Sequence, residues 1–558
     1  MSLKKIIFIF IFILSYQSTQ FSKSASFDSK NVSKYFSGIV AFDNKNNSEA
    51  LNFFNSSKIL LNKHDPYLKR YVYSLVLENK IPQAINTIKI NKDKKNSDFF
   101  EAYLLLILDS LKKSDFNKAQ DYLLETIELF QDERFNSAIL QTLRNYIYVF
   151  QENKILNNKK TFGNFSIISE TFQRCYLGDK NTEMYFKNLI NDLSTDYSRY
   201  IYFYLSYLIE NKRFKESENI VNEINYIDST LLLSQGKNWI ENGEAKKLIK
   251  VFSCKNHNDV TAEFFFLISN LYSSQDDFKE SNFYLNLSIF LNPKFVFNLS
   301  LVAENQYLNL EFNEAKKTLE NFQAEDDFYY WYRVKKESQI IAKQKTKKES
   351  LDHITTEFKK FKKPNNKFLF DVANFYKNSK EYEKAIEYYS KIIETLDEKP
   401  EIKADLLYRR GGTHERMQNY KKADEDLIHS LKLNPDDAYV LNYLAYSWLE
   451  RDFKINEAIK MLEKAYALED EDPYIIDSIG WAYYLINDFI KAERFLKRAV
   501  ELMPDDPIVN DHYGDILWKL NRKIQARYFW TNVLKMEDAE VKMLEKINTK
   551  LVLGLEES

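Results

Sequence analysis

The residues of this sequence whose types and spacing come closest to a reaction centre are His512 and two nearby carboxylates, Asp511 and Asp515. An imidazole between carboxylates could act as a general base or contribute to a metal site. His512 is, however, followed by Tyr513 and lies within a repeating helical pattern. That setting favours a buried histidine with a structural hydrogen bond, so we expect packing here and not catalysis.

The rest of the sequence contains no stronger candidate for catalysis. The six His residues are scattered, and none has the H-E-x-x-H spacing of a zinc protease. The G-x-S-x-G motif of hydrolases and the glycine-rich motifs that bind nucleotides do not occur. We predict that the protein is not an enzyme and that it uses no cofactor and no metal ion.

The composition indicates a long helical protein. Of the 558 residues, 44% are hydrophobic and 15% aromatic, but only 10 are Gly and 9 are Pro, so little interrupts a helix. The net charge of −2 gives no reason to expect binding to nucleic acid. We therefore expect an ordered, mainly helical chain with no nucleic-acid partner.

The N-terminal residues have the layout of a secretory signal. Lys4 and Lys5 precede an apolar run at residues 6–14, and polar and small residues follow. This order predicts a signal peptide over residues 1–25, because the apolar run is shorter than the roughly 20 residues that span a bilayer. We predict export, most simply to the periplasm of a Gram-negative bacterium. The alternative is an uncleaved N-terminus that anchors the chain to the inner membrane through residues 6–14.

A repeat of 34 residues organises the C-terminal part of the chain. Gly480 is followed by Ala492 and Pro504, and Gly514 is followed by Ala526 at the same distance as Ala492 from Gly480. Small residues at these positions let the two helices of a hairpin cross closely, and hairpins of this kind stack because one alone cannot bury both of its faces. The predicted packing residues are Gly411, Ala423, Ala458, Gly480, Ala492, Ala499, Gly514 and Ala526.

This spacing resembles the tetratricopeptide repeat, whose W-x2-L-G-x2-Y…A-x3-F…P pattern is matched over residues 366–536 and more weakly upstream. The resemblance implies an all-α fold, a right-handed superhelical solenoid of tetratricopeptide-type helical hairpins. Residues 442–446, 477–481 and 510–518 also resemble the last repeats of exported bacterial tetratricopeptide proteins. Some members of that group are periplasmic adaptors that present substrates to carboxyl-terminal processing proteases. Those members are often lipoproteins, whereas this chain has no Cys directly after its apolar run.

The repeats and their interruptions predict seven segments. They are a signal peptide (1–25), N-terminal repeats (26–135), degenerate helical repeats (136–260), middle repeats (261–341), a Lys-rich irregular segment (342–365), a C-terminal array (366–536), and a capping helix with a tail (537–558). The Lys-rich stretch, residues 343–367, holds nine Lys against three acidic residues, which favours a solvated helix face with a hinge. Its alternative role is contact with anionic lipid or an acidic partner.

The chain has two cysteines, Cys175 and Cys254, which are 79 residues apart and form no C-x-x-C motif. They could pair in an oxidising compartment, but their spacing corresponds to about two helical hairpins. We therefore predict two buried free thiols, with a disulfide as the alternative.

The predicted binding site is the concave face of the array, which the first helix of each repeat would line. Large aromatic residues suit such a site because they bury much area with few rotatable bonds. The positions that clamp a C-terminal carboxylate in some repeat domains carry no ring of cationic residues here, so an anionic chain end is not the expected ligand. The alternative is that these rings pack between helices. The predicted partner-binding residues are Tyr439, Asn442, Tyr446, Tyr474, Asp477, Trp481, Tyr484, Asp511, Asp515, Trp518 and Lys519.

These observations predict an exported scaffold or adaptor that binds protein or peptide partners through its C-terminal repeats. The alternative is a structural cell-envelope protein that docks through its N-terminal half and has no peptide-binding groove. Two routes to membrane contact stay open, an uncleaved N-terminus and the Lys-rich stretch.

Overall fold

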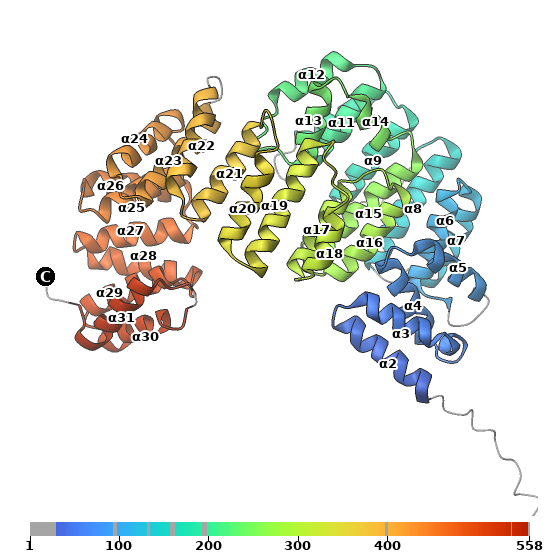
Figure 1. Cartoon of the computed structure of the whole chain (residues 1–558), viewed down its shortest axis with the longest axis horizontal. Helices are drawn as coiled ribbons and strands as arrows, with labels where there is room; N and C mark the ends of the chain where they lie inside the picture. Colours follow the sequence, from blue (N-terminus) through green and yellow to red (C-terminus); the bar gives the residue numbers. More distant parts are fainter. Residues whose placement is uncertain are drawn as a thin grey trace, which may run out of the picture. The chain divides into compact units, whose positions relative to one another are not determined.

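The computed structural model describes residues 29–92, 97–130, 134–156, 162–191, 198–396, 400–536 and 538–555. The predicted signal peptide, residues 1–25, lies outside these ranges. Every regular element in the described ranges is a helix, so the predicted all-α class is confirmed (Figure 1). The chain divides into two compact units, residues 1–340 and 341–558.

The first unit contains the helices up to α19, in which the boundary between the units falls. They are α2 (Ser29–Asp43), α3 (Asn47–Ser56), the short 3-10 helix η1 (Lys58–Asn62), α4 (Pro66–Leu77), α5 (Ile81–Asn91), α6 (Phe100–Lys112), α7 (Phe116–Phe130), α8 (Arg134–Glu152), α9 (Asn164–Leu177), α10 (Thr182–Ile190), α11 (Ser198–Glu210), α12 (Phe214–Glu223), α13 (Leu231–Glu241), α14 (Lys246–Val251), α15 (His257–Ser273), α16 (Phe278–Leu291), α17 (Asn298–Leu308), α18 (Phe312–Leu319) and α19 (Asp327–Gln344).

The second unit contains the helices that follow. They are α20 (Lys347–Phe358), α21 (Asn366–Asn378), α22 (Tyr382–Thr395), α23 (Pro400–Arg416), α24 (Tyr420–Leu433), α25 (Ala438–Leu449), α26 (Ile455–Leu468), α27 (Pro473–Leu485), α28 (Phe489–Leu502), α29 (Pro507–Lys519), α30 (Lys523–Val533) and α31 (Val541–Leu553). From α21 to α30, consecutive helices pair as hairpins, and each hairpin packs against the next.

Local chemistry explains where these hairpins turn and where the next one starts. Asn487 and Asn521 lie in the turns after α27 and α29, with left-handed φ values of 61° and 62°. A residue in that conformation ends a helix and reverses the chain within a few residues. Asp472 and Asp506 cap α27 and α29, the first helices of two successive hairpins. Each accepts hydrogen bonds from two backbone N–H groups of the first helical turn, and a proline follows each cap.

The glycines of the repeat lie where the two helices of a hairpin cross. A Cβ atom on Gly480 would be 2.8 Å from Leu496 Cγ, and one on Gly514 would overlap the ring of Trp530. Any larger residue would therefore push the helices apart. The other predicted packing residues are all buried, namely Gly411, Ala423, Ala458, Ala492, Ala499 and Ala526.

The repeats of the first unit do not form an open array, because α16 packs back against α4 and α5, and α15 against α6 and α8. Asn286 Nδ2 on α16 donates to the carbonyl oxygens of Val76 (2.9 Å) and Leu77 (3.2 Å). Lys112 Nζ, at the end of α6, donates to the carbonyl oxygen of Leu291 at 2.7 Å. The middle and N-terminal repeats thus pack on each other, and each satisfies backbone carbonyls at helix ends of the other.

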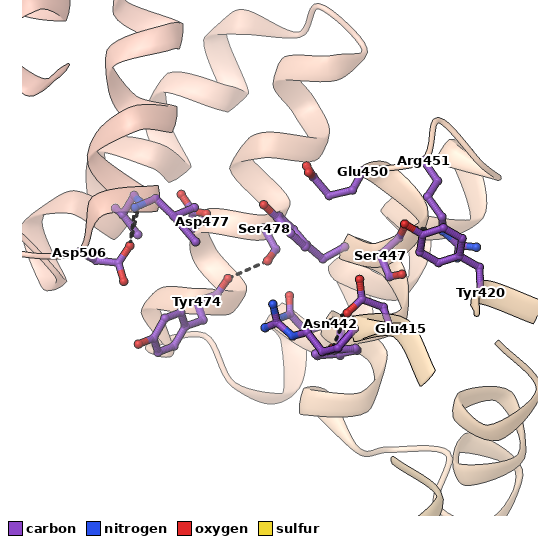
Figure 2. Close-up of a pocket in the computed structure, with 15 residues that line it drawn as sticks. Glu415, Tyr420, Asn442, Ser447, Glu450, Arg451, Tyr474, Asp477, Ser478 and Asp506 are labelled. Atoms are coloured by element: carbon purple, nitrogen blue, oxygen red, sulfur yellow. Dashed lines mark hydrogen bonds and ion pairs between the residues drawn. The ribbon is translucent and has the colours of Figure 1, made fainter. Parts of the chain in front are cut away.

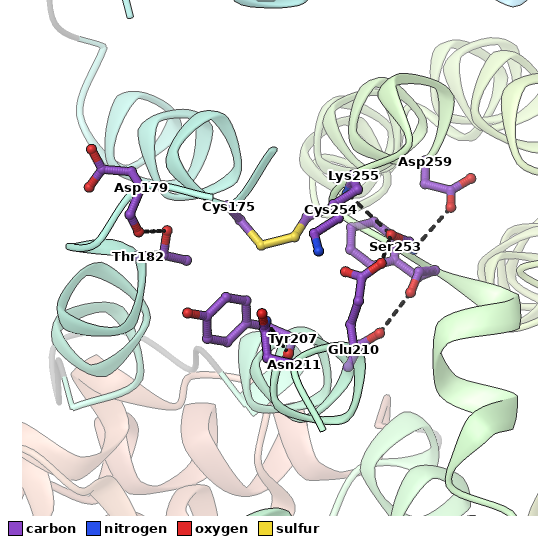
Figure 3. Close-up of a disulfide and its surroundings, with 12 residues drawn as sticks. Cys175, Asp179, Thr182, Tyr207, Glu210, Asn211, Ser253, Cys254, Lys255 and Asp259 are labelled. Carbon is purple, nitrogen blue, oxygen red and sulfur yellow. Dashed lines mark hydrogen bonds between the residues drawn. A yellow bond between two sulfur atoms is a disulfide. The ribbon is translucent and has the colours of Figure 1, made fainter. Parts of the chain in front are cut away.

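Cys175 and Cys254 form a disulfide with Cα atoms 5.8 Å apart, so the predicted pair of free thiols is wrong (Figure 3). Cys175 lies near the end of α9, and Cys254 lies between α14 and α15, which packs against α9. A shared aromatic core holds this region together, with ring centroids 5.3 Å apart for Phe172 and Phe203 and 4.3 Å apart for Phe203 and Phe252. The prediction relied on the 79 residues that separate the two cysteines in the sequence. It is wrong because the intervening helices return the chain to α9.

The Lys-rich segment, which we predicted to be irregular, is largely helical. Helix α20 covers Lys347–Phe358, and Thr346 caps it by accepting the backbone N–H of Glu349 at 3.1 Å. Most of the lysines are exposed, as expected for a solvated helix face. The prediction gave weight to the many lysines and overlooked an apolar stripe at helical spacing. This stripe is buried and stabilises the helix, and it consists of Leu351, Ile354 and Phe358.

Candidate partner-binding site

The second unit contains a pocket of about 480 Å³ between the first helices of successive hairpins (Figure 2). Its residues come mainly from α23, α25, α27 and the start of α29, so several repeats share one cavity. The lining residues are Glu415, Arg416, Tyr420, Asn442, Tyr443, Tyr446, Ser447, Glu450, Arg451, Tyr474, Asp477, Ser478, Asp506, Ile508 and Val509.

Four of the predicted partner-binding residues line this pocket: Asn442, Tyr446, Tyr474 and Asp477. Tyr474 is 58% exposed, and Tyr439, one turn before Asn442 on α25, is 55% exposed. Exposed tyrosines of this kind offer a partner a large apolar surface with a polar tip. The structure therefore gathers aromatic and polar groups from two successive repeats around one cavity.

The charged end of the pocket was not anticipated from the sequence. Glu415 and Arg416 end α23, and Glu450 and Arg451 follow α25, so a Glu-Arg pair recurs at the end of both first helices. That recurrence is the signal that could have identified them. Arg451 is already paired, since its Nη2 lies 2.8 Å from Asp424 Oδ1.

Two acceptor atoms of the pocket residues are buried without a hydrogen-bond partner among the described residues. They are Asn442 Oδ1 and Asp477 Oδ1. Trp481 Nε1, one turn after Asp477 on α27, is a buried donor that likewise has no partner there. A buried polar group without a partner costs roughly 1–3 kcal/mol. The two oxygens on lining residues, Asn442 Oδ1 and Asp477 Oδ1, therefore have no hydrogen bond of the fold to give up on binding.

Asp477 is held in place by an aromatic stack behind it. Its Oδ2 accepts a hydrogen bond from His512 Nδ1 at 2.8 Å. The His512 ring stacks on Trp481 with centroids 4.1 Å apart, and Trp481 stacks on Tyr484 at 4.7 Å. Trp481 and Tyr484 are thus supports behind the pocket and not part of its lining.

His512 is buried and hydrogen-bonded, as we predicted from the sequence. Burial lowers the pKa of the imidazole, but the carboxylates of Asp477, Asp511 and Asp515 together raise it by more, so the net pKa lies above the ordinary value. The hydrogen bond from His512 occupies Oδ2 of Asp477, and the other carboxylate oxygen, Oδ1, has no partner among the described residues.

The predicted groove does not continue into the last repeat, because Lys550 of α31 forms ion pairs with the carboxylates of that repeat. Lys550 Nζ lies 2.5 Å from Asp511 Oδ1 and 2.7 Å from Asp515 Oδ1, and Trp530 Nε1 donates to Asp515 Oδ1 at 3.0 Å. Burial, followed by the charge of Asp511, raises the pKa of Asp515 to about 6. The prediction that these two aspartates face an open groove is wrong, since the chain itself neutralises them.

Trp518 is also taken up by packing. Its ring lies 5.3 Å from that of Trp530, and a Cβ atom on Gly554 would overlap it, so the C-terminal end of the chain passes directly over Trp518. Lys519, the last residue of α29, is half-buried. Neither residue lines the pocket, and the groove position predicted for Trp518 is therefore wrong.

Two negative observations apply to the described ranges. No group of three or more His, Cys, Asp or Glu side chains there is arranged to hold a metal ion. No helix in those ranges combines the length and apolar character needed to cross a membrane.

Residues 367–395 and 404–437 match the family model described as Tetratricopeptide repeat. The TPR repeat-containing protein PA4667 of Pseudomonas aeruginosa is 34% identical over 119 residues, which make up 21% of this chain and 20% of that protein. This chain therefore matches only a small part of its relative's length. These matches, together with the stacked hairpins, define a helical solenoid that contains tetratricopeptide repeats.

Two solved structures resemble parts of the chain. A tetratricopeptide repeat protein from Parabacteroides merdae has 17% identity and a TM-score of 0.34, and the match covers 52% of this chain and 98% of that one. PilF of Pseudomonas aeruginosa has 17% identity and a TM-score of 0.29, with coverage of 34% and 87%.

Proposed function

We propose that this protein is a scaffold or adaptor whose second unit binds a segment of a partner protein in the pocket described above. The observation that carries the proposal is the pair of buried acceptors, Asn442 Oδ1 and Asp477 Oδ1, which belong to pocket residues and lack partners in the described chain. Such atoms destabilise a fold, and a bound segment that donates hydrogen bonds to them would remove that cost.

The tyrosines around the pocket support the same proposal. Tyr439 and Tyr474 are more than half exposed, and Tyr474 lines the cavity. Tyrosine is enriched among residues that dominate binding energy at protein interfaces. A partner segment would cover these rings while its N–H groups reach Asn442 and Asp477.

We also propose that the chain acts outside the cytoplasm and is not an enzyme. The signal-like residues 1–25 support export, and so does the Cys175–Cys254 disulfide, because disulfides persist mainly in oxidising compartments. The resemblance of the last repeats to periplasmic adaptors makes a carboxyl-terminal processing protease, or one of its substrates, the first partner class to test.

The test is affinity capture from a cell-envelope extract, with the full chain as bait and mass spectrometry as readout. The test variant is Tyr439→Ala with Tyr474→Ala, and the matched control is Tyr528→Ala, which removes a tyrosine that is 62% exposed on α30, away from the pocket. Trp481 and Trp518 are poor choices because both pack inside the fold. Any captured protein is then titrated against each purified bait.

A partner that binds the unaltered chain and the Tyr528→Ala control, but binds the double variant about tenfold more weakly or worse, would support the proposal. Equal binding to all three baits would contradict it. The alternative, docking through the N-terminal half, would then be the better explanation, and the exposed Phe36 and Val40 on α2 would be the first residues to change.

A further inference from the structure

Two carboxylates occupy equivalent positions in the last two repeats, but they have different hydrogen-bond and ion-pair partners. Asp477 on α27 and Asp511 on α29 each stand three residues before the glycine of their repeat. Asp511 is bonded to the ammonium group of Lys550, with Nζ and Oδ1 2.5 Å apart. The chain therefore supplies a cation to this position in its last repeat.

Among the described residues, no lysine or arginine pairs with Asp477, and the group that reaches it is the imidazole of His512. The residue that stands in the same sequence relation to Asp477 as Lys550 does to Asp511 is Ile516, which is apolar and buried. Asp477 is only 4% exposed, and while its Oδ2 is bonded to His512, its Oδ1 has no partner in the described chain. A buried, half-satisfied carboxylate in a pocket wall favours a ligand that donates hydrogen bonds and carries positive charge.

The other charged groups of the pocket also favour a ligand with positive charge. Glu415, Glu450 and Asp506 add carboxylates to the lining, against the two arginines Arg416 and Arg451. Arg451 is neutralised by Asp424, and its Nε donates to the carbonyl oxygen of Ser447 at 2.8 Å. The local field therefore attracts cations and repels anionic segments.

We propose that the pocket selects a lysine or arginine side chain of the partner segment, whose charged N–H group donates to Asp477 Oδ1. Asn442 Oδ1 accepts a second N–H from the same segment. This inference rests on the proposed function, since it names the chemistry of the segment that the pocket binds.

The test begins with selection of a random peptide library on the immobilised full chain. A selected peptide with a basic residue is compared with its norleucine counterpart by fluorescence anisotropy. The protein variants are Asp477→Asn, Asn442→Asp, and the matched control Glu501→Gln, which removes an exposed carboxylate on α28 outside the pocket. Circular dichroism checks that each variant is folded.

We expect the unaltered chain and Glu501→Gln to bind the basic peptide at least about tenfold more tightly than the norleucine peptide. In Asp477→Asn this ratio should fall close to one. In Asn442→Asp, which adds a carboxylate to the same wall, the ratio should rise, and this gain does not depend on the stability of the Asp477 variant.

Three results would overturn the inference, and they differ in what they say about the proposed function. If peptides bind in a manner that needs Tyr439 and Tyr474 but show no preference for a basic residue, the cation subsite is wrong and the binding pocket stands. The cation subsite is equally wrong if the tenfold ratio persists in Asp477→Asn. If no selected peptide depends on the two tyrosines, the proposed function and the subsite both fail.

Discussion

The hydroxyl of Tyr73 donates a hydrogen bond of 2.6 Å to Glu280 Oε1, although the two residues are 207 positions apart in the chain. Tyr73 lies on α4, and its ring also stacks on that of Phe283 on α16, with centroids 4.6 Å apart. Burial is the main reason that the pKa of Glu280 is raised. These contacts attach the middle repeats to the N-terminal repeats and close the first unit.

If this closure is a main source of stability, Phe283→Ala should destabilise the first unit by about 3–5 kcal/mol, because Phe283 is fully buried. Hydrogen exchange should then accelerate in α4 and α5 as well as in α16. Exchange monitored by mass spectrometry measures both effects. Phe36→Ala serves as the control, since Phe36 is 57% exposed. Faster exchange in α16 alone would show that α4 and α5 do not depend on it.

The Cys175–Cys254 disulfide should be present in the purified protein and should stabilise it. The two residues are 79 positions apart, and cross-linking a loop of that length stabilises by roughly 4 kcal/mol in the chain-entropy model. Replacing both cysteines by Ser should lower the free energy of unfolding by about that amount. Thiol titration of the denatured, unreduced protein provides the direct check, and two reactive thiols would contradict the pairing.

Substitution by Ala should destabilise the protein at Gly480 but not at Gly412. A Cβ on Gly480 would be 2.8 Å from Leu496 Cγ, whereas one on Gly412 would be 3.4 Å from Tyr443 Oη, an ordinary contact. Gly480→Ala should therefore cost about 1–3 kcal/mol through overpacking. Gly412→Ala should be neutral or stabilise the helix by up to about 1 kcal/mol. Thermal unfolding of both variants measures the difference, and equal shifts would show that the helices can move apart freely.

Removing the ammonium of Lys550 should be among the most damaging changes in the second unit. Lys550→Met leaves the carboxylates of Asp511 and Asp515 without their cation, and uncompensated buried charge costs about 3–5 kcal/mol. Urea unfolding gives the free energy. The control is Lys546→Met on the same helix, because Lys546 is exposed. Similar losses in both variants would mean that the buried network contributes little.

Asp259 should make the stability of the first unit depend on pH. It lies on α15, where burial raises its pKa to about 6, and its Oδ2 accepts the backbone N–H of Ser253 at 3.0 Å. The folded chain thus holds this proton more tightly than the unfolded chain, whose carboxyl has a pKa of about 4. The stabilising contribution is complete below pH of about 4 and is lost as the pH rises to about 6.

In Asp259→Asn this titration is absent. The difference in free energy of unfolding between the variant and the unaltered protein should therefore shift by about 2–3 kcal/mol in favour of the variant between pH 4 and pH 6.5. Denaturant unfolding across this range is the measurement. Asp121→Asn, which changes an exposed carboxylate, should show no such shift. A constant difference for Asp259→Asn would contradict a raised pKa.

The hairpins and their turns could be predicted because their determinants lie close together in the chain. The crossing of Gly480 over Leu496, and the caps at Asp472 and Asp506, involve residues within one repeat or at its border. In a stacked array each unit contacts mainly its neighbours, so a repeating pattern of small and capping residues is sufficient to specify it. The pocket follows partly from the same pattern, since Asn442 and Asp477 recur at one position of the repeat.

Only the tertiary structure decided which of the repeated positions stay open. Asp477 and Asp511 occupy the same position of the repeat in the sequence. In the structure Lys550 pairs with Asp511, whereas Asp477 Oδ1 has no partner among the described residues. Likewise, no periodic signal joins Cys175 to Cys254 or Tyr73 to Glu280. These pairings depend on small rotations that add up over many hairpins until distant helices meet, and a repeat pattern does not encode that sum.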